Sequence, residues 1–252
     1  MTNVILCGCG GRMGKVISSA GFRDIEIIAG VDINANALSN ALSFPVYEKI
    51  SDFPGNADVI IDFSHHSAIT SLLEYANKTC TPIVIATTGH TEDELAAIKK
   101  ASLDIAIFHS GNFSIGINLL INLARQAAHT LGEDFDIEII EKHHNKKLDA
   151  PSGTALMIAD AVAKERAKTE YIYDRHNVHE VRKTNEIGIH SLRGGTIVGE
   201  HEIMFAGSDE VISISHSAAS REIFANGAVR AALYVAQKSH GLYNMTDLIE
   251  GK

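Results

Sequence analysis

Short apolar runs alternate with amphipathic stretches through residues 1–114 of this 252-residue chain. The runs, each of strand length, occupy residues 4–7, 25–31, 59–63, 83–86 and 105–108. Two of the stretches between them, residues 69–78 and 92–102, carry apolar residues at helical spacing. Alternating strands and helices predict an α/β domain with a Rossmann-type, doubly wound parallel sheet. Ligands of such sheets lie at the carboxyl ends of the strands.

The pattern changes at residue 115, where a long apolar helix is predicted over residues 115–131. Period-2 alternation then predicts strands over residues 135–140 and 187–192, and a hairpin is predicted from residues 197–205 and 210–216. Residues 169–184 are polar and receive no assignment. These elements predict a second, α+β domain with a mixed sheet.

A last apolar helix is predicted over residues 224–239. We expect it to return to the first domain. The predicted organisation is therefore a dinucleotide-binding domain of residues 1–114, completed by a C-terminal helix within residues 223–252, and a substrate-binding and oligomerisation domain of residues 115–222.

A glycine-rich loop, Gly8-Cys9-Gly10-Gly11-Arg12-Met13-Gly14, follows the first apolar run and precedes a predicted helix. Glycines at this place let the backbone approach a pyrophosphate, which binds at the helix N-terminus. The spacing departs from G-x-G-x-x-G, because Met13 stands where the third glycine belongs. A plain glycine-rich turn remains the alternative interpretation.

Asp32 ends the second apolar run, about 20 residues beyond the glycines, where an acidic residue binds a ribose 2′-hydroxyl. It could also cap a helix over residues 34–42. Ile33 occupies the place where an arginine would receive a 2′-phosphate, which favours NADH over NADPH. Arg12 in the glycine loop could still meet that phosphate, so use of both cofactors stays open.

Small polar residues follow the fourth and fifth apolar runs, at Thr87-Thr88-Gly89 and at Ser110-Gly111-Asn112-Phe113. At the carboxyl ends of neighbouring strands they are expected to line the nicotinamide end of the cofactor. A β-branched strand terminus is the alternative interpretation of the two threonines.

The stretch from Glu141 to Ala155 holds His143, His144 and Lys147 between a predicted strand and a helix that begins near Ser152. Backbone N–H groups in the first turn of a helix lie at the positive end of its dipole. Gly153 and Thr154 occupy that turn, so the stretch brings cations and proton donors to a place suited to a carboxylate.

Charge and composition exclude several classes of partner. The net charge of 22 − 31 = −9 argues against nucleic acid and acidic membrane surfaces, which need a basic footprint. No run approaches the ~20 apolar residues of a membrane span. Three cysteines make no disulfide framework, so the cytoplasm is expected. No metal is expected, since Cys7 and Cys9 lack a second pair, and neighbours such as His143 and His144 point apart on a strand.

Five segments of the sequence together resemble the 4-hydroxy-tetrahydrodipicolinate reductase (dihydrodipicolinate reductase) family over essentially the whole chain. They are residues 8–14, 112–116, 141–155, 193–201 and 224–230. The resemblance implies an NAD(P)H-dependent reductase that converts the dihydrodipicolinate ring to tetrahydrodipicolinate in diaminopimelate and lysine biosynthesis. It also implies a homotetramer formed through the sheets of the second domain.

The resemblance further assigns roles to residues. It implies that His143 is the acid/base group, that Lys147 is its partner donor, and that the substrate carboxylates bind at His144, Ser152, Gly153 and Thr154. A histidine titrates near neutral pH and can protonate the anion left by hydride addition, which a nearby lysine stabilises. The implied cofactor contacts are Gly8, Cys9, Gly10, Gly11, Arg12, Met13, Asp32, Ala86, Thr87, Thr88, Ser110, Gly111, Asn112 and Phe113.

Two positions depart from the family pattern. Asp32 stands where many members have glutamate followed by arginine, and Ala86 where many have glycine. For Arg193, turn chemistry and a role near the substrate both remain open. Two other functions also stay open: a related two-domain dehydrogenase of another small acid or a sugar, and a non-enzymatic NADH sensor.

Overall fold

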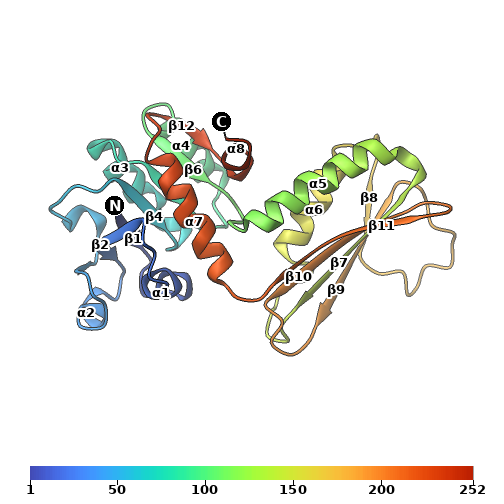
Figure 1. Ribbon diagram of the computed structural model, residues 1–252, viewed down its shortest axis with the longest axis horizontal. Helices are drawn as coiled ribbons and strands as arrows, with labels where there is room; N and C mark the ends of the chain where they lie inside the picture. The colour runs from blue at the N-terminus through green and yellow to red at the C-terminus, as the bar shows by residue number, and fades with distance from the viewer. Residues whose placement is uncertain (252) are drawn as a thin grey trace. The chain divides into compact units, whose positions relative to one another are not determined.

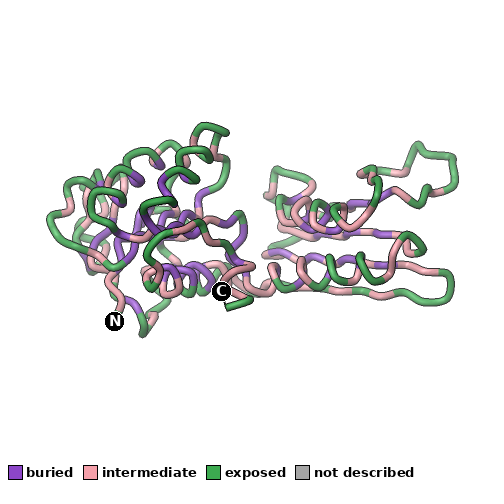
Figure 2. The backbone as a smooth tube through the Cα atoms, turned by 90° about the horizontal axis from the view of Figure 1, so that it is seen from above, coloured by how far each residue is buried: buried purple, intermediate pink, exposed green. Residues whose placement is uncertain are grey.

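The computed structural model describes residues 1–251 and divides the chain into two compact units (Figure 1). The first unit contains Met1–Ile115 and the chain from Arg221 onward, and the second contains Gly116–Ser220. The domain boundaries expected from the sequence lie within two residues of these crossings. Lys252, the last residue of the predicted C-terminal segment, lies outside the described residues. Figure 2 shows buried residues in the interior of both units and exposed residues in their outer loops.

The first unit is built on a seven-stranded parallel sheet with the order β12-β6-β5-β4-β1-β2-β3. Its strands are β1 (Thr2–Cys7), β2 (Ile25–Val31), β3 (Val46–Tyr47), β4 (Val59–Asp62), β5 (Ile83–Ile85), β6 (Ala106–His109) and β12 (Gly241–Tyr243). The predicted Rossmann-type sheet is confirmed. The five predicted runs form its interior, and the two strands that the sequence analysis missed are its short edges.

Helices cover both faces of this sheet. They are α1 (Arg12–Ser19), α2 (Ala35–Leu38), α3 (Ile69–Thr79), α4 (Glu92–Ala101), α7 (Glu222–Val235) and α8 (Met245–Glu250), with short 3-10 turns η1 (Ile50–Asp52) and η2 (His66–Ala68). Val4 and Leu6 of β1 belong to the core beneath α7, whereas Ile5 belongs to the core beneath α3 and α4. Side chains of successive strand residues thus pack into the cores on opposite faces of the sheet, as a doubly wound fold requires.

Two predicted helices have wrong bounds. The helix expected over residues 34–42 is only the four-residue α2, and the one expected over residues 224–239 ends at Val235. The C-terminal segment is therefore a helix, a strand and a second helix. Gly241 adopts a φ of +126°, which helical residues do not, and β12 then pairs with β6 while the Tyr243 ring packs 5.5 Å from Tyr234.

The second unit holds a five-stranded mixed sheet with the order β11-β10-β7-β9-β8, as the predicted α+β class required. Its strands are β7 (Asp136–His143), β8 (Glu170–Ile172), β9 (Glu186–Arg193), β10 (Gly199–Ala206) and β11 (Val211–Ala218). β9 runs parallel to β7, and β10 is antiparallel to β7 and β11. β8 lies in the stretch that received no assignment.

One face of this second sheet is covered by α5 (Ile115–Leu131) and α6 (Gly153–Ala163), and the 3-10 turn η3 (Gly132–Asp134) joins α5 to β7 (Figure 1). Ile137, Ile139 and Phe205 point from the strands into the core, against Ile158 and Val162 of α6. Burial alternates along the whole of β7, so the last residues of the strand on this face also point toward that core.

Candidate active site

β7 ends in two polar residues on its buried face. Burial alternates along the strand, so Glu141 and His143 share the side of Ile137 and Ile139. The Glu141 side chain is wholly buried, and that of His143 is 11% exposed. A buried carboxylate demands hydrogen-bond partners, because leaving it unpaired costs several kcal/mol.

Donors surround Glu141. The Nδ1–H of His143 donates to Oε2 at 2.6 Å, and the two terminal nitrogens of Arg193 donate at 2.8 and 2.7 Å. The backbone N–H of Ser152 adds a bond at 3.1 Å. Burial raises the pKa of Glu141, but the bonds from Arg193 and His143 outweigh it and hold that pKa at about 2. The carboxylate is therefore ionised at neutral pH.

The second nitrogen of His143 lies beside Gly199 of β10. A Cβ at position 199 would stand 3.0 Å from Nε2, closer than most real Cβ contacts. With Nδ1 bonded to Glu141, Nε2 is the nitrogen that remains for a substrate, and the glycine gives it room. The arrangement makes His143 a candidate proton donor at Nε2.

His201 lies beside this pair on β10, with its ring 5.2 Å from that of His143. Its Nε2 is 3.0 Å from Ser152 Oγ, which also accepts the Ala155 N–H and so caps α6. Burial, reinforced by His143, lowers the pKa of His201 to about 4. Two adjacent histidines thus have different partners, a carboxylate for His143 and a hydroxyl for His201. No pattern in the sequence predicts this role for His201.

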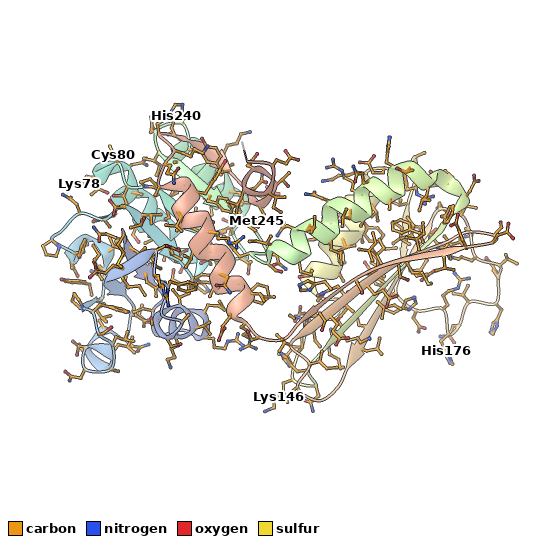
Figure 3. All side chains as sticks on the ribbon, viewed as in Figure 1. Lys78, Cys80, Lys146, His176, His240 and Met245 are labelled. Atoms are coloured by element: carbon orange, nitrogen blue, oxygen red, sulfur yellow. The ribbon has the colours of Figure 1, made fainter. Side chains whose placement is uncertain are left out.

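The loop after β7 brings a cation to the same place. Lys147 Nζ forms a 2.8 Å ion pair with Asp149, and this bond lowers the pKa of the Asp149 carboxyl. The backbone carbonyl of Asp149 accepts from Arg193 at 2.6 Å. His144 is half-buried in this turn, and its carbonyl accepts from the Lys147 N–H. Lys146 is exposed at the loop tip (Figure 3), as expected of a solvated residue.

The first turn of α6 completes the cluster. Gly153 is its first residue, and a Cβ there would meet no atom within 4 Å, so the space beside it is open. Thr154 follows in the same turn. The end of β7, the loop after it and the start of α6 therefore carry the six predicted catalytic and substrate-binding residues: His143, His144, Lys147, Ser152, Gly153 and Thr154.

The glycine loop of the first unit packs tightly on the helix that follows it. Gly8 has a φ of +73°, and a Cβ on it would stand 2.5 Å from the Phe63 carbonyl oxygen. A Cβ on Gly14 would stand 2.3 Å from the Gly8 oxygen. Gly14, rather than the residue at position 13, is therefore the residue whose missing side chain lets the helix approach the loop closely. Cys9 is fully buried, and Met13 packs against the core.

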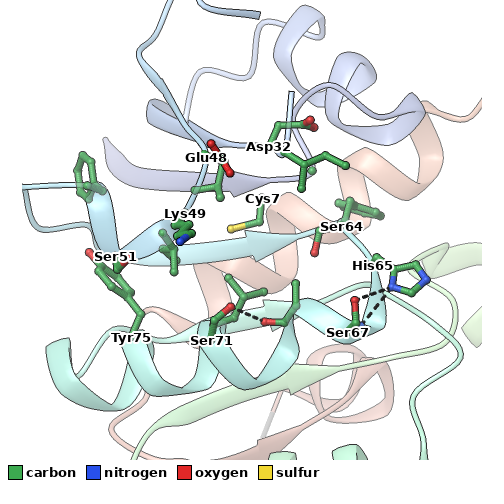
Figure 4. A pocket seen from close by; sticks show the side chains of 18 of the residues that line it. Cys7, Asp32, Glu48, Lys49, Ser51, Ser64, His65, Ser67, Ser71 and Tyr75 are labelled. Carbon is green, nitrogen blue, oxygen red and sulfur yellow. Dashed lines mark hydrogen bonds between the residues drawn. The ribbon is translucent and has the colours of Figure 1, made fainter. Parts of the chain in front are cut away.

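A cavity of about 1070 Å³ opens beside this loop (Figure 4). Gly8, Gly10, Gly11 and Asp32 of the predicted cofactor residues line it, with Ser64 and His65 from the loop after β4. β1 lies between β2 and β4, so the chain order reverses here, and such a switch point is where doubly wound sheets bind nucleotides.

Asp32 stabilises the loop at the edge of this cavity. Its Oδ2 accepts the Gly10 N–H at 2.9 Å and its Oδ1 accepts the Asn34 N–H at 2.9 Å. Asn34, rather than Asp32, stands at the N-cap of α2, so the helix-cap alternative is wrong. Ile33 and Arg12 are exposed.

The remaining predicted cofactor residues follow β5 and β6, and the cavity lining does not include them. Thr87 is buried and donates to Asp62 at 2.8 Å, while Thr88 is exposed. Ser110 Oγ donates to the Asn112 carbonyl at 2.9 Å. Phe113 lies in the core, 5.8 Å from the Phe108 ring. Ala86 also packs there, and Gly111 is exposed.

Among residues 1–251, no group of three or more histidine, cysteine, aspartate or glutamate side chains is arranged to hold a metal ion. Within the same range, no helix has the length and apolar character needed to cross a membrane.

We predict that the low pKa of His201 makes the second unit sensitive to acid. An unfolded histidine titrates near 6.5, so between pH 6.5 and 4 the unfolded chain binds a proton that the folded chain does not. Stability is therefore lost as the pH falls through this range, by roughly 2 kcal/mol from pH 8 to pH 5. Urea denaturation followed by circular dichroism at both pH values measures the loss. His201→Gln should reduce the difference, and an unchanged difference would contradict the prediction.

A doubly wound sheet with a cavity at its switch point, followed by a second unit with a histidine–carboxylate pair, is typical of two-domain pyridine-nucleotide oxidoreductases. A family model of the N-terminus of dihydrodipicolinate reductase matches residues 2–113, and one of its C-terminus matches residues 116–249. The chain belongs to the dihydrodipicolinate reductase family.

Relatives named 4-hydroxy-tetrahydrodipicolinate reductase match the chain over its full length. The 4-hydroxy-tetrahydrodipicolinate reductase of Caldanaerobacter subterraneus subsp. tengcongensis is 53% identical over 99% of both chains, and that of Clostridium novyi is 46% identical over 100% of both. Among solved structures, the dipicolinate-bound dihydrodipicolinate reductase from Paenisporosarcina sp. TG-14 has a TM-score of 0.78 and 26% identity over 97% of both chains.

More distant structures share the fold alone. A myo-inositol 2-dehydrogenase from Lactobacillus plantarum superimposes with a TM-score of 0.60 at 10% identity, covering 100% of this chain and 90% of that one. The family models and the full-length relatives do not favour the alternative of a related dehydrogenase with another substrate.

Proposed function

We propose that this chain reduces the dihydrodipicolinate ring to tetrahydrodipicolinate with a hydride from NAD(P)H, as 4-hydroxy-tetrahydrodipicolinate reductase in diaminopimelate and lysine biosynthesis. The observation that carries the proposal is the hydrogen bond between Glu141 and His143, placed beside Lys147 and the first turn of α6. The Paenisporosarcina relative binds dipicolinate, a planar ring with two carboxylates.

The first unit fits a dinucleotide. The cavity at the switch point meets the backbone of Gly8, Gly10 and Gly11, and the Asp32 carboxylate stands at its edge. We propose that these residues hold the pyrophosphate and ribose, with Cys9, Arg12 and Met13 contributing loop backbone. Ala86, Thr87, Thr88 and Ser110 to Phe113 are proposed for the nicotinamide end. When bound there, the cofactor supplies the hydride.

The second unit holds and protonates the substrate. His143 donates the proton on Nε2, and Lys147 stabilises the negative charge that hydride addition places on the ring. His144, Gly153 and Thr154 bind the carboxylates, helped by the positive end of the α6 dipole. Ser152 keeps that helix terminus in place, because its hydroxyl is engaged by the Ala155 N–H and His201.

An absorbance assay of reduced-nicotinamide loss tests the proposal, with substrate generated in place from pyruvate and aspartate semialdehyde by the preceding enzyme. Substrate-dependent oxidation is expected. No oxidation by folded protein that still binds NADH would refute the reductase and favour a sensor or a sibling dehydrogenase.

We predict that NADH is the preferred cofactor, because Asp32 repels a 2′-phosphate and the exposed side chain at position 33 cannot bind it. Asp32→Asn removes the charge and keeps one acceptor oxygen, enough for either the Gly10 or the Asn34 N–H group but not for both. It should shift the ratio of the kcat/KM values at least about tenfold toward NADPH, equivalent to about 1.4 kcal/mol. Asp24→Asn, on an exposed aspartate before β2, is the control. An unchanged ratio in Asp32→Asn would contradict the prediction.

We also propose a homotetramer formed through the second sheet. The face opposite α5 and α6 carries Ile140, Leu192 and Met204 among charged residues, and β11 is an eight-residue edge strand whose outer edge has no partner strand among the described residues. Sedimentation equilibrium should give four times the mass of one chain.

A cytoplasmic location is proposed because Cys7, Cys9 and Cys80 are free thiols, and cell fractionation tests it.

A further inference from the structure

The proposed reaction leaves the most deeply buried carboxylate of the second unit without a task. The Glu141 carboxylate has the same sign of charge as the substrate carboxylates, so it is not suited to bind them. It nevertheless receives both terminal nitrogens of Arg193, the Ser152 N–H and the Nδ1–H of His143. An ionised carboxylate in such a place is costly unless it is paired, so its partners indicate what it does.

We propose that Glu141, held by Arg193, is the positioning residue of His143: it keeps the imidazole proton on Nδ1 and aims Nε2 at the substrate. The effect of Glu141 on catalysis rests on the proposed function. The control of the His143 tautomer rests only on the hydrogen bonds observed in the second unit.

The tautomer follows from the bond itself. A carboxylate accepts only, so the 2.6 Å contact requires a proton on His143 Nδ1. When His143 is doubly protonated, the second proton is on Nε2, beside Gly199. Donation from Nε2 leaves a neutral imidazole that still carries its Nδ1 proton toward Glu141. The ring therefore does not have to turn between the two protonation states.

Arg193 makes this arrangement stable. In the parallel pairing of β7 and β9, Arg193 stands opposite His143 and reaches back across two residues to Glu141. The bidentate bond compensates the buried charge and fixes the plane of the carboxylate. Ser191, which stands opposite Glu141, adds a further hydrogen bond that lowers the pKa of the carboxyl.

The same arginine connects the two groups proposed for catalysis. Its Nη2 also donates to the Asp149 carbonyl at 2.6 Å, and the Asp149 side chain pairs with Lys147 at 2.8 Å. His143 and Lys147 are thus positioned from one guanidinium, through Glu141 on one side and Asp149 on the other. The guanidinium of Arg193 bonds Glu141, the Asp149 carbonyl and the Leu192 carbonyl, and these partners favour a positioning role for it.

A merely structural ion pair between β7 and β9 is the alternative. Its loss would lower stability without changing the protonation of His143. Other groups facing His143 are His201, which burial keeps neutral at neutral pH, and the charged Lys147; neither lies at hydrogen-bond distance from its Nδ1. Glu141 is therefore the charged group that bonds Nδ1 of His143 directly, and Arg193 holds that group in place.

The direct test uses the wild-type chain with 15N-labelled histidine, followed by NMR from pH 5 to pH 9. The His143 signals are assigned by their loss in His143→Asn. The expected result is a neutral form with the proton on Nδ1. A neutral form with the proton on Nε2 would overturn the proposal whether or not the chain reduces dihydrodipicolinate, so the two proposals fail separately.

We predict that Glu141→Gln lowers kcat at least about tenfold and leaves KM for NADH unchanged. Loss of the carboxylate charge removes the partner of the imidazolium, so the alkaline limb of the kcat/KM profile should move at least about one pH unit lower. Glu141→Asp, which keeps the charge, should recover part of both effects. Activity measured over pH 5 to 9 gives both quantities.

Glu165→Gln is the matched control, because Glu165 also pairs with an arginine and a histidine, Arg125 and His129, at a partly exposed site. It should leave the profile unchanged. If Glu141→Gln does not fold, Arg193→Lys retains the charge with a single contact, and should move the same limb by a smaller amount. A stability loss with an unmoved limb, in either variant, would show a structural ion pair and refute the positioning role.

Discussion

Replacement of His143 by asparagine is expected to lower kcat by about 10²- to 10⁴-fold, the usual contribution of a positioned general acid. The asparagine amide can donate to Glu141 as Nδ1–H does, so the buried carboxylate keeps a partner while the donor at Nε2 disappears. KM for NADH should stay within about twofold, since the residues proposed to bind the cofactor belong to the other unit. Steady-state kinetics with substrate generated in place measures both.

His190→Asn provides the comparison for this variant. His190 lies on β9, pairs with Glu138 at 2.8 Å and is 40% exposed. It should retain wild-type kcat. The assignment of His143 fails if His143→Asn, or the double variant His143→Ala with Lys147→Ala, turns over at a near-wild-type rate.

Replacement of Gly14 by alanine is expected to weaken NADH binding at least about tenfold and to lower the stability of the first unit by about 2 kcal/mol or more. The new methyl group would stand 2.3 Å from the Gly8 oxygen and 2.6 Å from the Cys9 Cα. Both are backbone atoms, so α1 has to move away from the loop that we propose holds the pyrophosphate. Fluorescence titration with NADH and thermal unfolding measure the two effects.

Lys15→Ala, on the next residue of α1, introduces the same side chain at an exposed position. Both properties should remain close to wild type there. Wild-type NADH affinity in folded Gly14→Ala would show that the contact is relieved without moving the loop, and that the third glycine of this site is dispensable.

The interior of the first sheet was predictable because five apolar runs of strand length specify it. Its edges were not, because β3 has two residues and β12 has three, too few to show a period. The last helix was predicted too long for a related reason. Ala236, Gln237 and Lys238 all favour helix, whereas the termination depends on Gly241 and on pairing with β6, which is remote in sequence.

The proposed substrate residues were predictable because they occupy one short stretch of chain. Glu141 is part of that stretch, yet its role depends on Arg193, which is 52 residues away and arrives through the register of β7 and β9. Sequence periodicity predicts which residues share a face but not which strands pair. The role of Gly14 was also not predictable from the sequence. The motif spacing shows only that Met13 stands where the third glycine belongs, and the backbone distances show that Gly14 takes the part of that glycine.

The discontinuous first unit determines an order of events during synthesis. Residues 1–115 emerge from the ribosome first, but the sheet face that includes Val4, Leu6 and Phe108 is covered by α7, which ends at Val235. The second unit is one uninterrupted stretch and can bury its core once residue 220 has emerged. The first unit is therefore the first to be synthesised and the last to complete its fold. In the interval, its uncovered apolar face is what a chaperone would recognise on the nascent chain.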